Sequence, residues 1–290
     1  MKSRWITNLL LLLGVAMLTL VARYQPGLDK PVETAAITRL SADQVRRIHL
    51  NRPVRPDLVL VRDAQGGWFI EHEPRLPADR HQVDSLTRLV QQKPVRSYAA
   101  GELELDRLQL DPPYASAIMN DLAIEFGGLE PLQDLRYVRV NDRVHLIPDL
   151  YLHLVEAAYT NFVRRRLLPP QSRIERLVLP GLTLSKDDGH WSLDPEQPVS
   201  ADTLQDFVER WQDATALSVR AADADIGGTP IEIGYQGGKV LRLLLVAREP
   251  ELLLARPDWG IEYRMGEDAD FLLKLPHPEA AGGDAQPASE

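Results

Sequence analysis

One stretch of the sequence occurs twice, and this repeat constrains the fold more than any other feature. The first copy runs from Gly66 to Gln82 and the second from Gly189 to Gln205. In both copies a glycine turn is followed by a tryptophan-bearing segment, a proline-containing loop and an aspartate that can cap a helix. The tryptophan and the aspartate are equally spaced in the two copies. Each copy therefore predicts a strand followed by a helix.

The segments around each copy extend the repeat into two units of similar order. Each unit predicts a meander of short antiparallel strands, a capped helix and a second meander. In the first unit we expect a closing helix from Asp149 to Leu168, and in the second a truncated helix that starts near Phe271. The predicted fold class is α+β: an N-terminal transmembrane helix followed by two similar α+β units, antiparallel meanders with packed helices, related by internal duplication.

The predicted domain boundaries follow shifts in composition along the chain. Residues 1–22 form a membrane anchor, and residues 23–36 form a polar linker that contains proline and glycine. Residues 37–168 form the first α+β unit and residues 169–275 the second. Residues 276–290 lack large apolar side chains that could build a core, and we expect a disordered tail there.

An apolar run near the N-terminus predicts the anchor. Residues 5–22 carry no charge, and a helix of that length rises about 27 Å, close to the hydrocarbon thickness of about 30 Å. The alternative is a cleaved signal peptide, with Lys2 and Arg4 as its basic start. No small residue stands three positions before a cut after Ala22, so we favour an uncleaved signal-anchor. We expect a single-pass protein of the bacterial inner membrane, with its N-terminus in the cytoplasm and its body in the periplasm.

Charge and cysteine content exclude several classes of function. The chain has 33 basic and 42 acidic side chains, so we expect no nucleic-acid binding, which needs clustered lysine and arginine. It has no cysteine, which excludes disulfides, zinc–thiolate sites and thiol catalysis. The histidines form no H-x-H or H-E-x-x-H pair, and Glu71-His72-Glu73 would alternate its side chains along a strand. We therefore predict no metal site and no cofactor.

No catalytic motif stands out, and we predict that the protein is not an enzyme. There is no G-x-S-x-G elbow, and the paired glycines stand at predicted hairpin turns, Gly127-Gly128 among them. We interpret Trp68 and Trp191 as core residues, because each alternates with an apolar partner on a strand. The alternative is that they form a surface that stacks on sugar or peptide.

Three consecutive arginines are the candidate partner-binding site. Arg164, Arg165 and Arg166 stand between the predicted closing helix and Pro169-Pro170. They could bind an acidic partner or lipid headgroups. The alternative, which we favour, is that they complement the C-terminal dipole of the helix and link the two units through aspartate or glutamate contacts.

Several short motifs resemble those of the DUF4340 family. They are the Gly-x-Trp strand, the Pro-Ala-Asp helix start, Leu110-Asp111-Pro112-Pro113, Arg136-Tyr137-Val138, and Asn161 to Leu168 with its Arg-Leu-Leu ending. The resemblance covers most of residues 37–220, with one departure: Gln109 stands where relatives usually carry glycine. It implies a bacterial membrane-anchored protein, with some relatives linked as auxiliary components to ABC-type transport systems of the gliding-motility kind. It brings no catalytic residues.

These observations lead to three functional hypotheses. The first is a non-enzymatic, membrane-anchored periplasmic accessory or scaffold protein, whose partners would be the inner membrane, through residues 5–22, and the permease or ATPase of an ABC transporter. The second is a periplasmic binding module for envelope glycan or peptide, which would use a groove between the two units. The third is an envelope hydrolase without a recognisable motif.

Overall fold

The computed structural model describes residues 13–15, 17, 19 and 35–275. The predicted anchor (1–22) and linker (23–36) therefore lie largely outside the described residues, and the predicted tail (276–290) lies wholly outside them. Among the helices that are described, none is both long and apolar enough to cross a membrane. The transmembrane helix of the predicted fold class thus has no counterpart in this part of the chain.

The first half of the body is one antiparallel sheet of nine strands, in the order β4-β3-β2-β1-β6-β7-β8-β9-β5. Its strands are β1 (Arg47–Asn51), β2 (Leu58–Arg62), β3 (Trp68–Ile70), β4 (Leu76–Pro77), β5 (Arg96–Ala99), β6 (Ala115–Met119), β7 (Leu122–Glu130), β8 (Leu135–Val140) and β9 (Arg143–Pro148).

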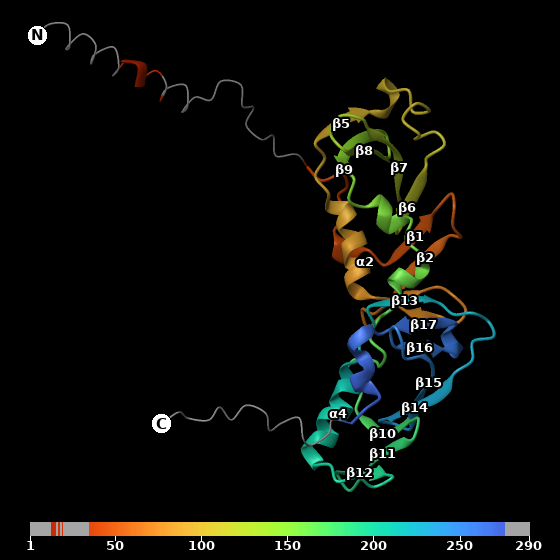
Figure 1. The fold of residues 1–290 in the computed structure, drawn as a ribbon. Helices are drawn as coiled ribbons and strands as arrows, with labels where there is room; N and C mark the ends of the chain where they lie inside the picture. The colour runs from red at the N-terminus through yellow and green to blue at the C-terminus, as the bar shows by residue number, and fades with distance from the viewer. Residues whose placement is uncertain (1–12, 16, 18, 20–34, 276–290) are drawn as a thin grey trace, which may run out of the picture.

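The second half is an antiparallel sheet of eight strands, in the order β12-β11-β10-β14-β15-β16-β17-β13. Its strands are β10 (Ile174–Leu179), β11 (Leu182–Asp187), β12 (His190–Asp194), β13 (Ser218–Ala221), β14 (Thr229–Tyr235), β15 (Lys239–Ala247), β16 (Leu253–Arg256) and β17 (Ile261–Arg264). Apart from β4, the second sheet repeats the strand order of the first, strand for strand (Figure 1).

The helices are few and mostly short. They are the α-helices α2 (Arg80–Thr87), α3 (Leu152–Val155) and α4 (Ala201–Asp213), and the 3₁₀ helices η1 (Ala42–Gln44), η2 (Arg88–Gln91), η3 (Ala100–Glu102), η4 (Tyr159–Phe162), η5 (Pro257–Trp259) and η6 (Glu267–Leu272). The two longest, α2 and α4, lie on the same side of the molecule, one in each half (Figure 1).

The predicted α+β class is wrong, because the two meanders of each unit join edge to edge. Strand β1 pairs with β6, with Ile48 opposite Met119, and β10 pairs with β14, with Leu177 opposite Ile233. Each half is therefore one large antiparallel sheet, to which helices are a minor addition. The residues that join the meanders are fully buried, so the joined strands form the centre of the core.

The repeated stretch forms a strand and a capped helix in both halves. The Asp79 carboxylate accepts a hydrogen bond from the Gln82 backbone N–H at 3.2 Å at the start of α2. In the second half the cap of α4 is Ser200, whose hydroxyl oxygen accepts from the Thr203 N–H at 3.2 Å. Trp68 is buried in the core, which confirms its interpretation, whereas Trp191 is half-buried and packs against the core.

The predicted helix from Asp149 to Leu168 is wrong. The structure has only the single turns α3 and η4 there, and the chain is extended at Ala158 (ψ 150°) and again at Val163 (ψ 136°). The apolar pattern is nevertheless used, because Val155 and Phe162 are buried. Tertiary contacts override the helical pattern, since the chain must leave the first half here and reach the second.

Candidate functional site

The three predicted arginines lie in the connector, which we define as Val163–Leu168, between the two sheets. The backbone of the connector is hydrogen-bonded to both halves. The Arg164 N–H donates to the Pro77 carbonyl in the first half at 2.9 Å, and the Arg165 carbonyl accepts from the Ala216 N–H in the second half at 2.9 Å. The connector is therefore held on both sides.

The side chains of Arg165 and Arg166 bind acidic groups within the chain. Arg165 Nε lies 3.5 Å from the carboxylate of Asp79, the cap of α2, and its Nη1 donates to the Leu217 carbonyl at 3.3 Å. Arg166 forms an ion pair with Asp213 at the end of α4. The interpretation that the arginines link the two units through acidic contacts is confirmed for Arg165 and Arg166. Its other part, that they complement the C-terminal dipole of the closing helix, is wrong, because that helix does not form. The further prediction that the three arginines bind a partner stays a prediction.

Arg164 points into the second half. Its Nε is enclosed and makes no hydrogen bond, and the hydroxyl of Tyr263, fully buried on β17, is likewise enclosed without a hydrogen bond of normal geometry. Burial lowers the pKa of Arg164 and raises the pKa of Tyr263, and Arg256 lies close enough to act on both groups. The Arg164 guanidinium and the Tyr263 hydroxyl therefore lie near each other inside the second half.

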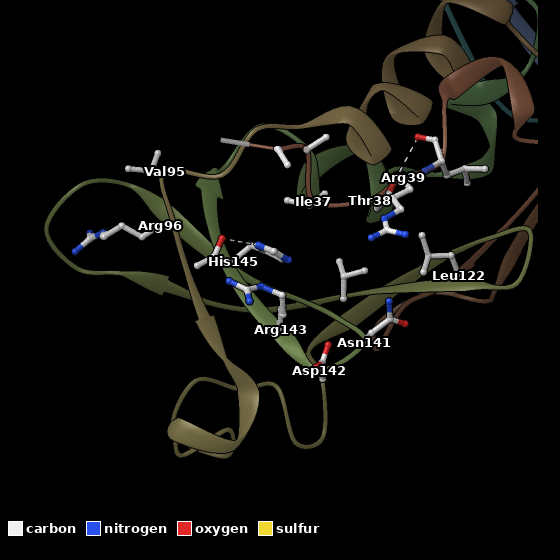
Figure 2. Close-up of a pocket in the computed structure, with 15 residues that line it drawn as sticks. Ile37, Thr38, Arg39, Val95, Arg96, Leu122, Asn141, Asp142, Arg143 and His145 are labelled. Carbon is white, nitrogen blue, oxygen red and sulfur yellow. Dashed lines mark hydrogen bonds between the residues drawn. The ribbon is translucent and has the colours of Figure 1, made fainter. Parts of the chain in front are cut away.

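The most voluminous pocket described lies at the free end of the first sheet, beside β5. It measures about 920 Å³ and is open to solvent. One wall is the segment Ala35–Leu40, and the opposite wall comes from β5 and β9 (Figure 2). Residues that line it include Arg39, Arg96, Asn141, Asp142, Arg143 and His145. We call this the first-half pocket.

Local structure holds the walls of the first-half pocket in place. The Ile37 N–H donates to the Gln92 carbonyl at 2.9 Å, and the Thr38 hydroxyl donates to the Val90 carbonyl at 2.7 Å. These bonds fix the first wall to the end of η2. On the other wall, the Ser97 hydroxyl and His145 Nδ1 lie 2.8 Å apart across the β5–β9 pair. The pocket is therefore preformed.

The electrostatics of the pocket are basic. Arg39, Arg96 and Arg143 are all exposed, and Asp142 is the one carboxylate among the lining residues. Burial and the neighbouring Arg143 lower the pKa of His145, so its imidazole is neutral at pH 7. The sequence analysis missed these residues, because they come from three distant segments and form no local motif.

Within the described part of the chain, no three His, Asp or Glu side chains gather as metal ligands would. Glu71-His72-Glu73, the segment of the sequence most like a metal site, makes other contacts. Glu71 forms a two-pronged ion pair with Arg47, at 3.0 and 2.9 Å, and the ring of His72 stacks on that of Tyr159 at 5.1 Å.

Comparison with known proteins gives a family and no further relative. Residues 68–227 match the family model described as a domain of unknown function, DUF4340. A search of curated proteins and a search of solved structures each found no match. The matched region begins at β3, crosses the connector and ends just after β13, so it includes parts of both sheets. Since the match covers more than half of the chain, the protein belongs to the DUF4340 family.

Proposed function

We propose that this chain is a non-enzymatic accessory protein of a bacterial inner membrane. Residues 5–22 hold it at the membrane, and the two-sheet body stands in the periplasm as a scaffold for a transport complex of the ABC type. Among the arginines of the connector, Arg164–Arg166, the partly exposed Arg165 and Arg166 are the proposed contact for the permease or the ATPase-bearing assembly. The uncharged run at the N-terminus and the family resemblance support the location of the body.

The observation that carries this proposal is the connector. A scaffold must keep its two binding faces at a fixed distance, and this connector is bonded to the first half through Pro77 and Asp79 and to the second through Ala214 and Ala216. A hinge that closes over a ligand needs a few residues whose backbone is free to rotate. The backbone bonds at Arg164, Arg165 and Leu167 leave little such freedom.

The alternative of a glycan or peptide binder between the two units has one feature in its favour. A pocket of about 520 Å³ lies beside the connector and is lined in part by Trp68, Phe69 and Arg164. Stacking on a sugar needs an exposed aromatic face, and Trp68 is only 6% exposed, while Phe69 carries the guanidinium of Arg75 at 4.3 Å. The scaffold therefore remains the preferred function.

The experiment is affinity purification of the full-length protein from native membranes in mild detergent, followed by mass spectrometry. A version without residues 1–22, exported by a cleavable signal, is the control. We expect stoichiometric recovery of an ABC permease or ATPase with the full-length protein. Recovery of the protein alone in both forms would overturn the proposal.

A matched pair of variants then tests the connector as the contact. Arg165→Gln removes one partly exposed charge from the connector, and Arg107→Gln removes one from the first half, where Arg107 pairs with Glu104. We expect Arg165→Gln to reduce the recovered partner and Arg107→Gln to leave it unchanged. Equal recovery with both variants would move the contact away from the connector.

A further inference from the structure

The charge of the first-half pocket is opposite to that of the chain. The formal net charge of the protein is −9, yet the pocket has three arginines and a single carboxylate, Asp142, among its lining residues. In a protein with an excess of acidic side chains, such a concentration of positive charge is unexpected from composition alone. A concave basic site attracts anions from solution or from a surface.

Two of the arginines are available to a ligand. Neither Arg39 nor Arg143 makes a side-chain hydrogen bond or ion pair with another described residue, whereas Arg96 lies 3.3 Å from Gln133 and 3.9 Å from the Glu130 carboxylate. Figure 2 shows Arg39 on one side of the hollow and Arg143 on the other, next to His145. A guanidinium group presents a planar fork of N–H donors that fits two oxygens of a phosphate.

His145 adds a neutral donor between the two arginines. With its pKa lowered by burial and by Arg143, the ring is neutral at pH 7, and Nδ1 can accept the hydrogen of the Ser97 hydroxyl. The ring hydrogen then stands on Nε2, on the side away from Ser97. His145 can therefore donate to an anion without adding a charge that would repel the arginines.

The pocket also has an apolar part. Val95 is 55% exposed at its rim, and Leu122, Val140 and Ile37 lie among its lining residues. Ile37 and Val140 are already buried by the protein, but a small inorganic anion would leave the exposed Val95 and the half-buried Leu122 in water. A molecule with an anionic head and an apolar stem would cover them while its head meets the arginines.

The pocket lies next to the place where the body leaves its tether. The wall Ala35–Leu40 begins with the last two residues of the segment 23–36, which the sequence predicts to be a polar linker. Resting on the proposed membrane location, we propose that the first-half pocket binds the phosphate of an anionic phospholipid headgroup in the bilayer that holds the chain.

The test uses the full-length protein in lipid nanodiscs. Because the chain has no cysteine, Val95→Cys gives a unique position at the pocket rim for a fluorophore that reports on polarity. Emission is followed as the fraction of phosphatidylglycerol in phosphatidylcholine discs is raised. We expect a saturable blue shift with phosphatidylglycerol and none with phosphatidylcholine alone.

Variants identify the binding groups. Arg39→Gln and Arg143→Gln should each raise the phosphatidylglycerol fraction at half-response about fivefold, and the double variant about thirtyfold. Arg107→Gln also removes an exposed charge from the same half and should leave the response unchanged. Circular dichroism melting of each variant separates loss of binding from loss of folding.

The outcomes separate this proposal from the membrane proposal. Protein that is not retained by discs of either lipid overturns the anchor. Protein that is retained but shows no shift, or a shift that the double variant keeps, overturns lipid binding by the pocket. A shift produced equally by millimolar inorganic phosphate in phosphatidylcholine discs would overturn the headgroup as the ligand and identify the pocket as a site for soluble phosphate.

Discussion

The same position in the two halves is hollow in the first and filled in the second. In both, the segment that leads into the sheet is anchored to the residue that ends the long helix: Ile37 N–H donates to the Gln92 carbonyl, and Leu167 N–H donates to the Ala214 carbonyl, at 2.9 and 3.1 Å. From there the halves diverge. The lead-in segment of the first half borders the first-half pocket, whereas that of the second half is the connector.

Two substitutions of residue type explain the divergence. Counting from the helix ends, Pro94 corresponds to Ala216, and proline has no N–H to donate to the lead-in segment as Ala216 does to Arg165. In the strand pairs, Ser97 lies opposite His145, while Val219 lies opposite Tyr263. The larger Tyr263, together with Arg164, fills the second site. Two sheets with the same strand order can therefore differ at this position, with a pocket in one half and the buried contact with the connector in the other.

The largest effect on stability is expected at a pair of strand positions that holds an ion pair in the second half and an apolar pair in the first. Arg220 binds Glu262 in the second half, at positions that Tyr98 and Val144 occupy in the first. Arg220→Leu leaves the buried Glu262 carboxylate without a partner and should lower the free energy of unfolding by about 3 kcal/mol. The double variant Arg220→Tyr with Glu262→Val should cost less than about 1 kcal/mol. Urea unfolding measures both, and equal losses would refute the correspondence.

The next largest effect on stability is expected at the hydrogen bond between the Ala216 N–H and the Arg165 carbonyl. Ala216→Pro removes the N–H that the Arg165 carbonyl accepts and should destabilise the protein by about 2 kcal/mol. The reciprocal Pro94→Ala breaks no hydrogen bond and mainly frees the unfolded chain, so it should change stability by only about 0.5 kcal/mol. Thermal melting of the two variants tests the contrast, and a loss with Pro94→Ala as large as that with Ala216→Pro would contradict it.

Removing the enclosed hydroxyl of Tyr263 should raise the stability of the protein. Tyr263→Phe removes a buried polar group that has no hydrogen bond of normal geometry and should stabilise the protein by about 1 kcal/mol. Tyr98→Phe on β5, where the side chain is half-buried, serves as the control and should have no effect. A lower melting temperature for Tyr263→Phe would mean that the hydroxyl has a partner, Arg256 being the nearest candidate.

The corresponding residue of the first half, His145, should make stability depend on pH. Its folded-state pKa is lowered by burial and Arg143, so the unfolded chain binds the proton more readily. Its contribution is thus complete above the ordinary histidine pKa of about 6.5 and is lost as pH falls below it. Urea unfolding at pH 7.5 and pH 5 should show a smaller loss for His145→Asn than for the parent protein. If both proteins lose the same stability between pH 7.5 and pH 5, His145 is not the source of the pH dependence.

The smallest effect concerns the loop before each sheet's second meander. In the first half this loop contains Gln109, whose φ of 55° lies in the left-handed region, whereas neither Gly227 nor Gly228 in the loop of the second half lies in that region. Gln109→Gly should relieve that backbone and stabilise the protein by about 0.5 kcal/mol. Differential scanning calorimetry can resolve such a shift, and a lower melting temperature would show that the Gln109 side chain contributes contacts worth more than the strain.

The sequence predicts local structure better than it predicts how strands assemble. The strand at Trp68 and the helix cap at Asp79 follow from alternation and capping, which depend on neighbours in the chain. The pairing of Ile48 with Met119 does not, because either meander could have remained a separate sheet. Gly127-Gly128, predicted as a turn, lies inside β7 at an irregularity of the β7–β8 pairing.

Of the candidate sites, one could be predicted in part from the sequence and the other could not. That Arg165 meets Asp79 could be anticipated, since charged residues between two units seek acidic partners. The first-half pocket could not, because Arg39, Arg143 and the Ser97–His145 pair meet only after β5 has crossed to the edge of the sheet beside β9. A pocket made by such a crossing has no signature in a single sequence.

The edge-to-edge union of the meanders has a kinetic consequence. Hairpins such as β6–β7 and β8–β9 join residues close in sequence and can form within microseconds, but β1 must wait for β6, and β9 for β5, across long loops. An intermediate with formed hairpins and an unformed β1–β6 seam would expose two unpaired central edges, which makes that seam the point at which refolding competes with aggregation.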